Sequence, residues 1–430
     1  MCSSDLRCLD LAVEELDEEA IRAAHLVAFH LPMHTATRIA AKLTSRIREL
    51  NPRARLCFYG LYAPMNEVYL RRLGADFILG GEFESGLKSL VGRLGSAPPG
   101  ELLSQLEPTV SIERQQFLMP DRSGLAELSR YAQLNTGRGE LRTVGYTEAS
   151  RGCRHQCRHC PVVPVYRGRF RIVQPERVLE DIRQQVAAGA EHVTFGDPDF
   201  FNGVGHALRI VQSLHQEHPN LTYDVTIKIE HLLRNRNHLE TLRLTGCLFV
   251  TSAVESVDDS VLALLDKGHT REDFVEALRL CREVGLTLHP TFVAFTPWIS
   301  IAGYRDLLAV IAELDLIEEV SPIQLAIRLL IPAGSKLLEL PEVQALVGPF
   351  DEEALVHPWR HPEPEVDRLQ VEVQALVRSA SAGHEHRRQI FSRVWSLAEG
   401  ADGAPPNPFP SWFSEVGPRP VPYLTEPWYC

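Results

Sequence analysis

Three closely spaced cysteines are the residues of this 430-residue chain whose type and spacing are best suited to chemistry. Cys153, Cys157 and Cys160 stand in the stretch Ser-Arg-Gly-Cys-Arg-His-Gln-Cys-Arg-His-Cys-Pro, a Cys-x3-Cys-x2-Cys pattern. Three thiolates so close together can hold three corners of an iron–sulfur cube, and the usual fourth ligand has no candidate nearby in the sequence. An iron without a protein ligand is an open coordination site, so the pattern indicates a [4Fe-4S] cluster that takes part in chemistry.

Zinc is the alternative metal for the same loop. His155 and His159 are interleaved with the thiols, so a tetrahedral site of three Cys and one His is chemically feasible. Structural zinc sites, however, usually consist of two separated ligand pairs, which a single tight triplet does not provide. The spacing therefore favours iron–sulfur. A non-catalytic protein that senses through a cluster or zinc remains the alternative to an enzyme.

The cysteine loop resembles the signature of the radical S-adenosylmethionine (radical SAM) enzymes. The resemblance implies that the open iron chelates S-adenosylmethionine, and that one electron from the cluster cleaves the sulfonium to a 5′-deoxyadenosyl radical. It also implies an electron donor, either a reductase or a flavodoxin or ferredoxin. It places His159 where the family commonly has an aromatic ring near the adenine. The substrate, the bond attacked and any catalytic residue stay unassigned.

A carboxylate pair follows the second predicted strand of the core. Catalytic groups of parallel βα barrels gather at the carboxyl ends of the strands, and at this place the family holds the ammonium group of S-adenosylmethionine. This chain has Gly196, Asp197 and Asp199 there, where many members of the family have Gly-Gly-Glu. The alternative is an Asp-Pro turn with two solvated acids. The position directly after a strand favours cofactor binding.

The ends of two later strands carry the remaining candidates. Ser252 and Glu255 end the fourth predicted strand, and Lys267-Gly follows. These residues resemble pieces common in the family that contact the ribose or the amino acid part of the cofactor. Arg328 ends the last predicted strand, and we expect it to bind a carboxylate of the substrate or of the cofactor.

Regular alternation of strands and helices from residue 143 to 340 must position these residues. Runs of apolar and β-branched residues predict six strands. These strands cover residues 143–147, 192–195, 222–229, 248–254, 286–293 and 323–328. The sequence thus predicts an α/β fold, and the family resemblance implies that residues 143–340 form a partial (β/α)6 barrel.

The first 96 residues alternate strand and helix in the same way. Strands expected at 26–31, 55–60 and 75–79 predict a parallel, Rossmann-like sheet. The segment resembles the cobalamin-binding-like domain that precedes many radical SAM cores. That domain binds cobalamin through Asp-x-His-x-x-Gly, a motif that the chain lacks. The resemblance also makes residues 7–13 the second strand of the domain, from which we expect a missing N-terminus. Cobalamin-dependent methyl transfer would be the alternative activity if that segment supplied the ligand loop.

Residues 97–142 are predicted to be a linker and residues 341–430 a C-terminal extension. The extension starts helical and becomes rich in proline and aromatic residues. Because exposed Trp and Phe are costly, we expect it to pack over the barrel mouth. The ending at Cys430 resembles the Cys-Cys-Ala-Glu-Pro or Cys-selenocysteine-Ala-Glu-Pro tail of a radical SAM subgroup, cut after its first cysteine. A redox or metal-binding role for Cys430 and no role at all both stay open.

The composition limits the class of protein further. A formal net charge of −12 disfavours a nucleic-acid partner, and the six arginines between residues 151 and 171 are expected to compensate an anionic cluster. No apolar run approaches the length of a membrane span, and no signal sequence opens the chain. Nine cysteines, an odd number scattered through a long chain, are typical of a reducing compartment. These features predict a cytoplasmic protein without a membrane partner.

Overall fold

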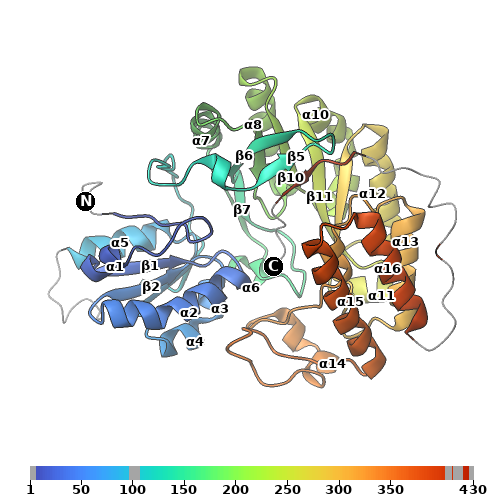
Figure 1. Ribbon diagram of the computed structural model, residues 1–430. Helices are drawn as coiled ribbons and strands as arrows, with labels where there is room; N and C mark the ends of the chain where they lie inside the picture. The colour runs from blue at the N-terminus through green and yellow to red at the C-terminus, as the bar shows by residue number, and fades with distance from the viewer. Residues whose placement is uncertain (1–5, 96–106, 402–408, 410–419, 426–430) are drawn as a thin grey trace.

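Two sheets organise the molecule (Figure 1). The computed structural model describes residues 6–95, 107–401, 409 and 420–425, and all structural statements concern those residues. A four-stranded N-terminal sheet lies beside a larger, curved sheet that is surrounded by helices. The predicted α/β class, a Rossmann-like sheet followed by a partial barrel, is confirmed.

The N-terminal sheet is parallel throughout, in the order β1-β2-β3-β4. Its strands are β1 (Leu26–His30), β2 (Arg55–Tyr59), β3 (Phe77–Gly81) and β4 (Val110–Ser111). Its helices are α1 (Glu18–Ala23), α2 (His34–Leu50), α3 (Tyr62–Met65), α4 (Glu67–Arg72) and α5 (Glu84–Leu94). Apolar residues of both sheet faces are buried, which explains why these strands read as nearly continuous apolar runs.

Two details of this region correct the prediction. Residues 7–13 are irregular and end in a turn, not in a strand. The reason is local: Asp10 accepts a hydrogen bond from the backbone N–H of Ala12 (3.0 Å), a turn-forming contact that an extended strand does not make. The fourth strand, β4, comes instead from the predicted linker, and its two residues are too few for a periodic pattern.

The curved sheet holds five parallel strands in the order β12-β11-β10-β9-β6, extended by β5 and β13. The parallel strands are β6 (Leu141–Thr147), β9 (His192–Phe195), β10 (Thr222–Thr226), β11 (Cys247–Glu255) and β12 (Thr287–Phe292). The main helices around them are α7 (Pro175–Ala187), α8 (Val204–Glu217), α9 (Ile229–Arg234), α10 (Leu239–Leu244), α11 (Asp259–Leu264), α12 (Arg271–Glu283) and α13 (Ile301–Glu313). The sequence predicted all five parallel strands.

The sixth predicted strand is replaced by a short 3-10 helix, η5 (Pro322–Leu325). Proline has no N–H to give to a strand ladder. The side chain of Gln324 takes over part of that function, because its Oε1 accepts the N–H of Phe292 at 2.8 Å. Of the predicted strand, only Arg328 forms a bridge, an isolated parallel one to Phe295, which lies beyond the end of β12. The barrel is therefore less complete than six full strands.

The C-terminal residues flank the opposite side of the barrel from the N-terminal sheet (Figure 1). Here α15 (Pro364–Ala382) and α16 (Arg387–Gly400) pack against each other and on α13 and η5. The last described strand, β13 (Tyr423–Leu424), pairs with β5 (Gln133–Asn135), which in turn pairs with the amino-terminal half of β6. The described end of the chain thus lies away from the carboxyl edge. Most of the proline- and aromatic-rich stretch that the sequence placed over the mouth lies outside the described residues. Cys430 lies outside the described residues.

The Tyr423 ring also brings the two ends of the curved sheet together. The guanidinium of Arg387, from α16 on the β12 side, lies 4.7 Å from the centroid of this ring on the β13 side. No helix among the described residues is long and apolar enough to cross a membrane.

Candidate iron–sulfur and cofactor site

The cysteine loop follows the first parallel strand of the barrel, as the sequence predicted. After β6, the short strand β7 (Ser150–Gly152) pairs with β8 (Phe170–Ile172), and the loop with α6 (Val162–Tyr166) lies between them. Gly152 has φ +76, and a Cβ there would lie 2.4 Å from the Tyr166 ring, so the turn into the loop requires glycine. Cys153 and Cys157 are buried, Cys160 is half-buried, and none of the three forms a disulfide. All three thiols are therefore free to bind metal.

Two buried lysines lie next to these thiols. Lys228, two residues after the end of β10, donates from Nζ to the Sγ of Cys157 at 3.7 Å. Lys267 Nζ donates to the carboxylate of Glu255 at 3.3 Å. Burial tends to lower the pKa of Lys267, but the nearby Glu255 and Cys157 raise it on balance, so the ammonium stays charged. A buried charge needs a partner of opposite sign. Two buried ammonium groups beside three thiols therefore fit an anionic iron–sulfur group held by those thiols.

His159 and Glu255 are brought together by this arrangement. His159 Nε2 lies 3.0 Å from Glu255 Oε1, and the same oxygen accepts from Lys267. Burial acts to raise the pKa of Glu255, but Lys267 and then His159 lower it to about 2. Glu255 has φ +69, next to a bulge in β11 after Ala253, so the backbone is strained where the carboxylate is delivered. Two of the predicted cofactor residues thus contact each other, next to a lysine whose pKa is raised in part by Cys157.

Gly196 and Asp197 support the loop from the neighbouring strand. The Asp197 carboxylate accepts from the N–H of Ala149 (2.8 Å) and the hydroxyl of Ser150 (2.5 Å), at the start of the turn that leads to Cys153. Burial raises the pKa of Asp197 to about 7, against the lowering effect of these hydrogen bonds. A Cβ on Gly196 would lie 1.8 Å from the Tyr146 hydroxyl oxygen. Both contact protein groups, and cofactor binding by either stays a prediction.

Asp199 is fully buried, which excludes a solvated Asp-Pro turn. Its Oδ1 accepts the N–H of Phe201 at 3.1 Å, and its Oδ2 lies 2.7 Å from His231 Nδ1 and 3.6 Å from His155 Nε2. Cys153, His155 and Asp199 each offer a ligand atom within 4.8 Å of the others. This trio gives the zinc alternative a definite geometry, with His155 and not His159 as the nitrogen ligand.

Ser252 and Arg328 lie apart from the thiols. Ser252 shares the helix-covered face of β11 with Val250 and Val254, which belong to the main hydrophobic core. Arg328 donates to Asp367 (2.6 Å) and stacks 3.4 Å from the ring centroid of Trp359. The position of neither residue supports the expected cofactor contact.

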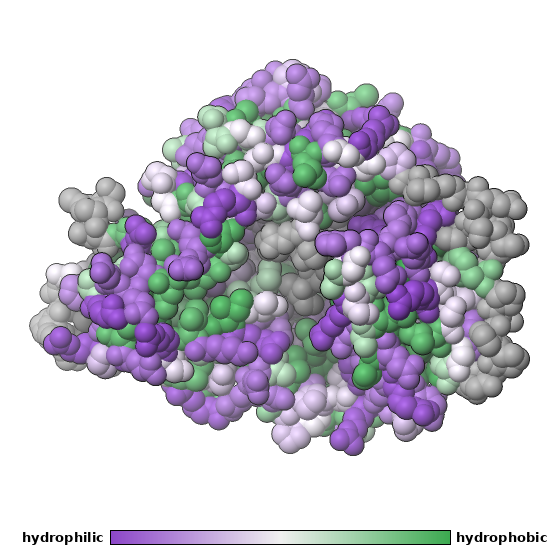
Figure 2. All heavy atoms as spheres, viewed as in Figure 1, coloured by the Kyte–Doolittle hydropathy of each residue, from purple (hydrophilic) through white to green (hydrophobic). Residues whose placement is uncertain are grey.

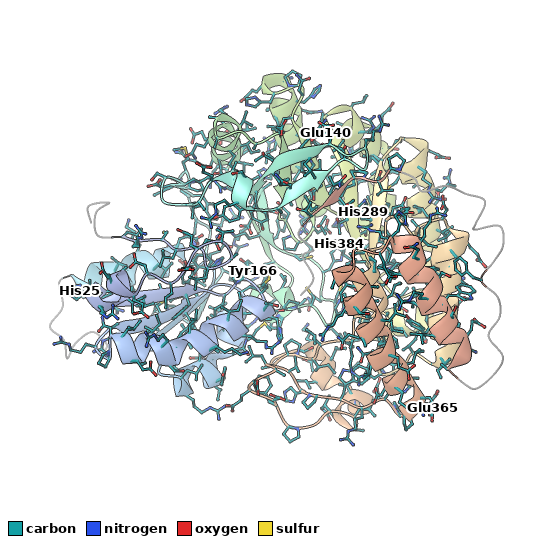
Figure 3. The ribbon with its side chains drawn as sticks, in the orientation of Figure 1. His25, Glu140, Tyr166, His289, Glu365 and His384 are labelled. Atoms are coloured by element: carbon teal, nitrogen blue, oxygen red, sulfur yellow. The ribbon has the colours of Figure 1, made fainter. Side chains whose placement is uncertain are left out.

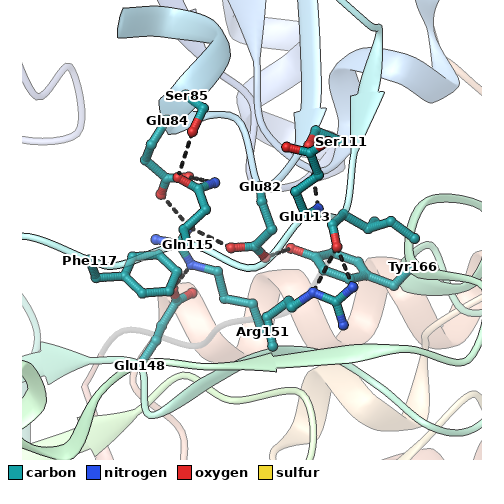
Figure 4. A network of polar contacts seen from close by, with 12 residues as sticks. Glu82, Glu84, Ser85, Ser111, Glu113, Gln115, Phe117, Glu148, Arg151 and Tyr166 are labelled. Carbon is teal, nitrogen blue, oxygen red and sulfur yellow. Dashed lines mark hydrogen bonds and ion pairs between the residues drawn. The ribbon is translucent and has the colours of Figure 1, made fainter.

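The N-terminal sheet presses its carboxyl edge against the cysteine loop. Leu61, Met65, Val110 and Ile112 pack with Cys153, Cys160 and α6 in one apolar cluster. Figure 4 shows the polar contacts beside it: the Tyr166 hydroxyl donates to the fully buried Glu82 at 3.0 Å, and Arg151 pairs with Glu84 and Glu148. Figure 3 shows Tyr166 at this junction between the two regions. The loop is thus held from two sides.

The sequence missed three of these groups. Lys228, His231 and Glu82 each stand alone in the sequence, without a motif around them. The only signal was position, because Glu82 directly follows β3 and Lys228 comes two residues after the end of β10. Together the site offers three thiols, two ammonium groups and an ionised carboxylate at one sheet edge, an arrangement suited to an anionic cluster and a zwitterionic ligand.

A partial barrel of parallel strands with a three-cysteine loop at its carboxyl edge defines a class of βα-barrel proteins that hold an iron–sulfur cluster. Residues 147–296 match the family model of the radical SAM superfamily. This match agrees with the resemblance that the cysteine loop carries.

Among curated proteins, the chain is similar to the hopanoid C-3 methylase of Methylococcus capsulatus, with 25% identity over 230 residues, 52% of this chain and 43% of that protein. It is also similar to the tRNA-2-methylthio-N(6)-dimethylallyladenosine synthase of Desulfosudis oleivorans, with 25% identity over 239 residues, 52% of this chain and 45% of that protein. The chain thus spans about half the length of these relatives.

Solved structures share the fold. The radical S-adenosylmethionine methyltransferase TsrM from Kitasatospora setae is 19% identical with a TM-score of 0.56, over 69% of this chain and 62% of that one. The cobalamin-dependent S-adenosylmethionine radical enzyme OxsB is 15% identical with a TM-score of 0.58, over 83% and 59%. At these identities the likeness concerns architecture, including the presence of an N-terminal sheet before the barrel.

Proposed function

We propose that the chain is a radical SAM enzyme whose Cys153, Cys157 and Cys160 hold a [4Fe-4S] cluster. When bound, the cluster would donate one electron to S-adenosylmethionine, whose reductive cleavage supplies a 5′-deoxyadenosyl radical. The observation that carries the proposal is the set of three free thiols on one loop at the sheet edge, inside the matched segment and beside two buried lysines.

In this proposal, the residues around the thiols bind and orient the cluster and the cofactor. Lys228 and Lys267 offset the negative charge of the thiolate-held group. Glu255, kept ionised by Lys267 and His159, presents a carboxylate to the ammonium or to a ribose hydroxyl of the cofactor. The packed edge of the N-terminal sheet restricts motion of the loop. An external reductase, flavodoxin or ferredoxin would supply the electron.

Anaerobic reconstitution tests the proposal directly. We expect brown protein with about four irons and four sulfides per chain, which forms 5′-deoxyadenosine from S-adenosylmethionine when reduced with dithionite. Stoichiometric zinc without sulfide would contradict the proposal and favour the Cys153, His155 and Asp199 trio as a zinc site. A cluster that forms but neither cleaves the cofactor nor changes its EPR signal on adding it would favour a sensor.

Cobalamin-dependent methyl transfer is the second candidate. It is favoured by the shared fold with TsrM, a methyltransferase by name, and OxsB, which is cobalamin-dependent by name. In the described residues, however, α6 packs on the carboxyl edge of the N-terminal sheet, and the His34 ring lies 2.7 Å from the Ala354 carbonyl oxygen. These residues do not form a corrinoid pocket, so we derive no step through cobalamin. Absorbance titration with hydroxocobalamin, and the ratio of S-adenosylhomocysteine to 5′-deoxyadenosine, decide between the two candidates.

A further inference from the structure

The curved sheet has two faces of opposite character. The outward face, under the helices, is buried and, apart from Ser252, mainly apolar, with Val193, Phe195, Tyr223, Val225 and Val250 in the main core. The inward face carries polar side chains at most of the alternate positions, while Phe249 and Val144, the register partners of Asp224 and His192, belong to a small apolar cluster. The polar side chains are those of Thr194, Asp224, Thr226, Thr251, His289 and Thr291, and all but the buried Asp224 are partly exposed. In a parallel sheet that is covered on both faces, both faces are normally apolar. The threonines of the inward face therefore indicate that this face is not covered in that way.

The strand register puts these polar residues side by side. Thr194 is opposite Asp224, and Thr226, Thr251 and His289 form one row across β10, β11 and β12. Thr226 is two residues before Lys228, whose ammonium contacts Cys157. Since side chains two apart on a strand share a face, the row lies directly below the cysteine loop.

Several hydrogen-bonding groups of this inward face have no partner among the described residues. His192 Nε2 (2.9 Å) and the Thr194 hydroxyl (2.7 Å) both contact Oδ1 of Asp224, which leaves its Oδ2 free. The hydroxyls of Thr226, Thr251 and Thr291 make no hydrogen bond to the described part of the protein.

His289 adds a buried nitrogen. Its Nε2 is shielded from solvent and has no partner within the described chain. Burial, and then Arg387, lower the pKa of His289 to about 3, so the ring is neutral near pH 7 and offers one donor and one acceptor. Figure 3 shows His289 on the side of the barrel that faces the C-terminal helices. Figure 2 shows that the outer surface of these helices is largely hydrophilic, with some apolar patches. Leaving a buried polar group unmatched costs about 1–3 kcal/mol, so water or a ligand must satisfy it.

We propose that the inward face binds the substrate, and that this substrate is a small polyhydroxyl or amino-polyhydroxyl molecule and not a hydrocarbon. Asp224 Oδ2 accepts from a hydroxyl or amine of the substrate, while the threonine hydroxyls and His289 bond its other oxygens. A hydrocarbon would leave all of these groups unmatched, and sites built to hydrogen-bond reject such analogues strongly. The inference rests on the proposed function, because it takes the radical to be formed at the cysteine loop directly above this face.

Saturation-transfer NMR on the full reconstituted chain with S-adenosylmethionine, without reductant, tests the proposal. The probes are glucosamine, myo-inositol and toluene. We expect transfer to glucosamine or myo-inositol and none to toluene, and at least tenfold weaker binding in Thr251→Val. Asp224→Asn should weaken glucosamine binding to a similar degree. The matched control is Thr35→Val, the same change at an exposed position on α2, which should bind as the wild type does.

Three outcomes would overturn the proposal: transfer to toluene alone, no transfer to either polar probe, or polar binding that Thr251→Val leaves unchanged. Thermal unfolding of each variant verifies that it is folded, and Thr251→Val, which is nearly isosteric, serves if Asp224→Asn does not fold. Because binding is measured without reduction, its result is separate from the cleavage assay. Failure to form 5′-deoxyadenosine would contradict the proposed function, whereas failure to bind the polar probes would contradict only the substrate class.

Discussion

The carboxyl edges of the two parallel sheets meet around α6, and they are built very differently. The barrel edge gathers thiols, lysines and carboxylates, with Lys228, Lys267 and Glu255 all buried. The N-terminal edge is filled by apolar contacts to α6 and by Glu82, whose buried carboxylate receives the Tyr166 hydroxyl. Parallel α/β sheets commonly bind ligands at this edge. The difference indicates that the barrel edge binds the cluster and its ligand, whereas the N-terminal edge supports the cysteine loop.

The largest effect is expected for the cluster itself. Cys153→Ala should reduce iron and sulfide from about four each per chain to near zero, because the loop would then supply two of the three thiols that hold the cluster. Cys57→Ala is the matched control, since Cys57 is a buried thiol of the N-terminal sheet. Iron and sulfide analysis after anaerobic reconstitution measures both. Equal loss of iron and sulfide in the two variants would contradict the assignment of the cluster to the barrel edge.

Next in size is the ion pair at the barrel edge. Lys267→Met leaves the buried Glu255 carboxylate without its ammonium partner, and breaking a buried pair in this way costs about 3–5 kcal/mol. Urea unfolding gives the change in free energy. The double variant Lys267→Met/Glu255→Leu should recover much of it, while Arg183→Met, which breaks an exposed pair with Glu217, should change stability little. If Lys267→Met left the free energy of unfolding unchanged, Lys267 and Glu255 would not form a stabilising buried ion pair.

A smaller effect is expected at the supporting edge. Tyr166→Phe removes the hydroxyl that donates to Glu82, and a buried acceptor deprived of its donor costs about 1–3 kcal/mol. Tyr69→Phe, on α4 of the same domain, removes a hydroxyl for which the described structure shows no hydrogen bond and should be near neutral. Urea unfolding compares them. If the two variants were alike, Glu82 and Tyr166 would not couple the sheets.

The last prediction concerns how the free energy of unfolding changes with pH, and not a loss of stability at a single pH. Burial raises the pKa of Asp197 in the folded protein to about 7, from an ordinary value near 3.8. The folded state therefore binds more protons than the unfolded state between about pH 4 and 7, and this contribution to stability is lost as the pH rises through that window. Asp197→Asn should flatten the slope of unfolding free energy between pH 5 and 7. An identical slope would show that Asp197 is ionised throughout.

Local spacing determined the strongest predictions. The three cysteines lie within eight residues, so their pattern fixes a common loop whatever surrounds it. Strand periodicity likewise predicted β6 and β9 to β12, because alternation and apolar runs are properties of neighbouring residues. The match of residues 147–296 to the radical SAM superfamily agrees with both. The predicted boundaries at residues 96, 142 and 340 stay predictions.

Contacts across distant residues could be decided only by the tertiary structure. Asp199 meets His231, and Glu82 meets Tyr166, through folding of separate elements that no short pattern joins. Ser252 and Glu255 are three residues apart, yet one faces the helices and the other the cysteine loop. Strand alternation and the bulge in β11 decide this, because a shift of one residue turns a side chain to the other face. The sequence named the residue types of the site, and the packing of the sheets selected which of them meet.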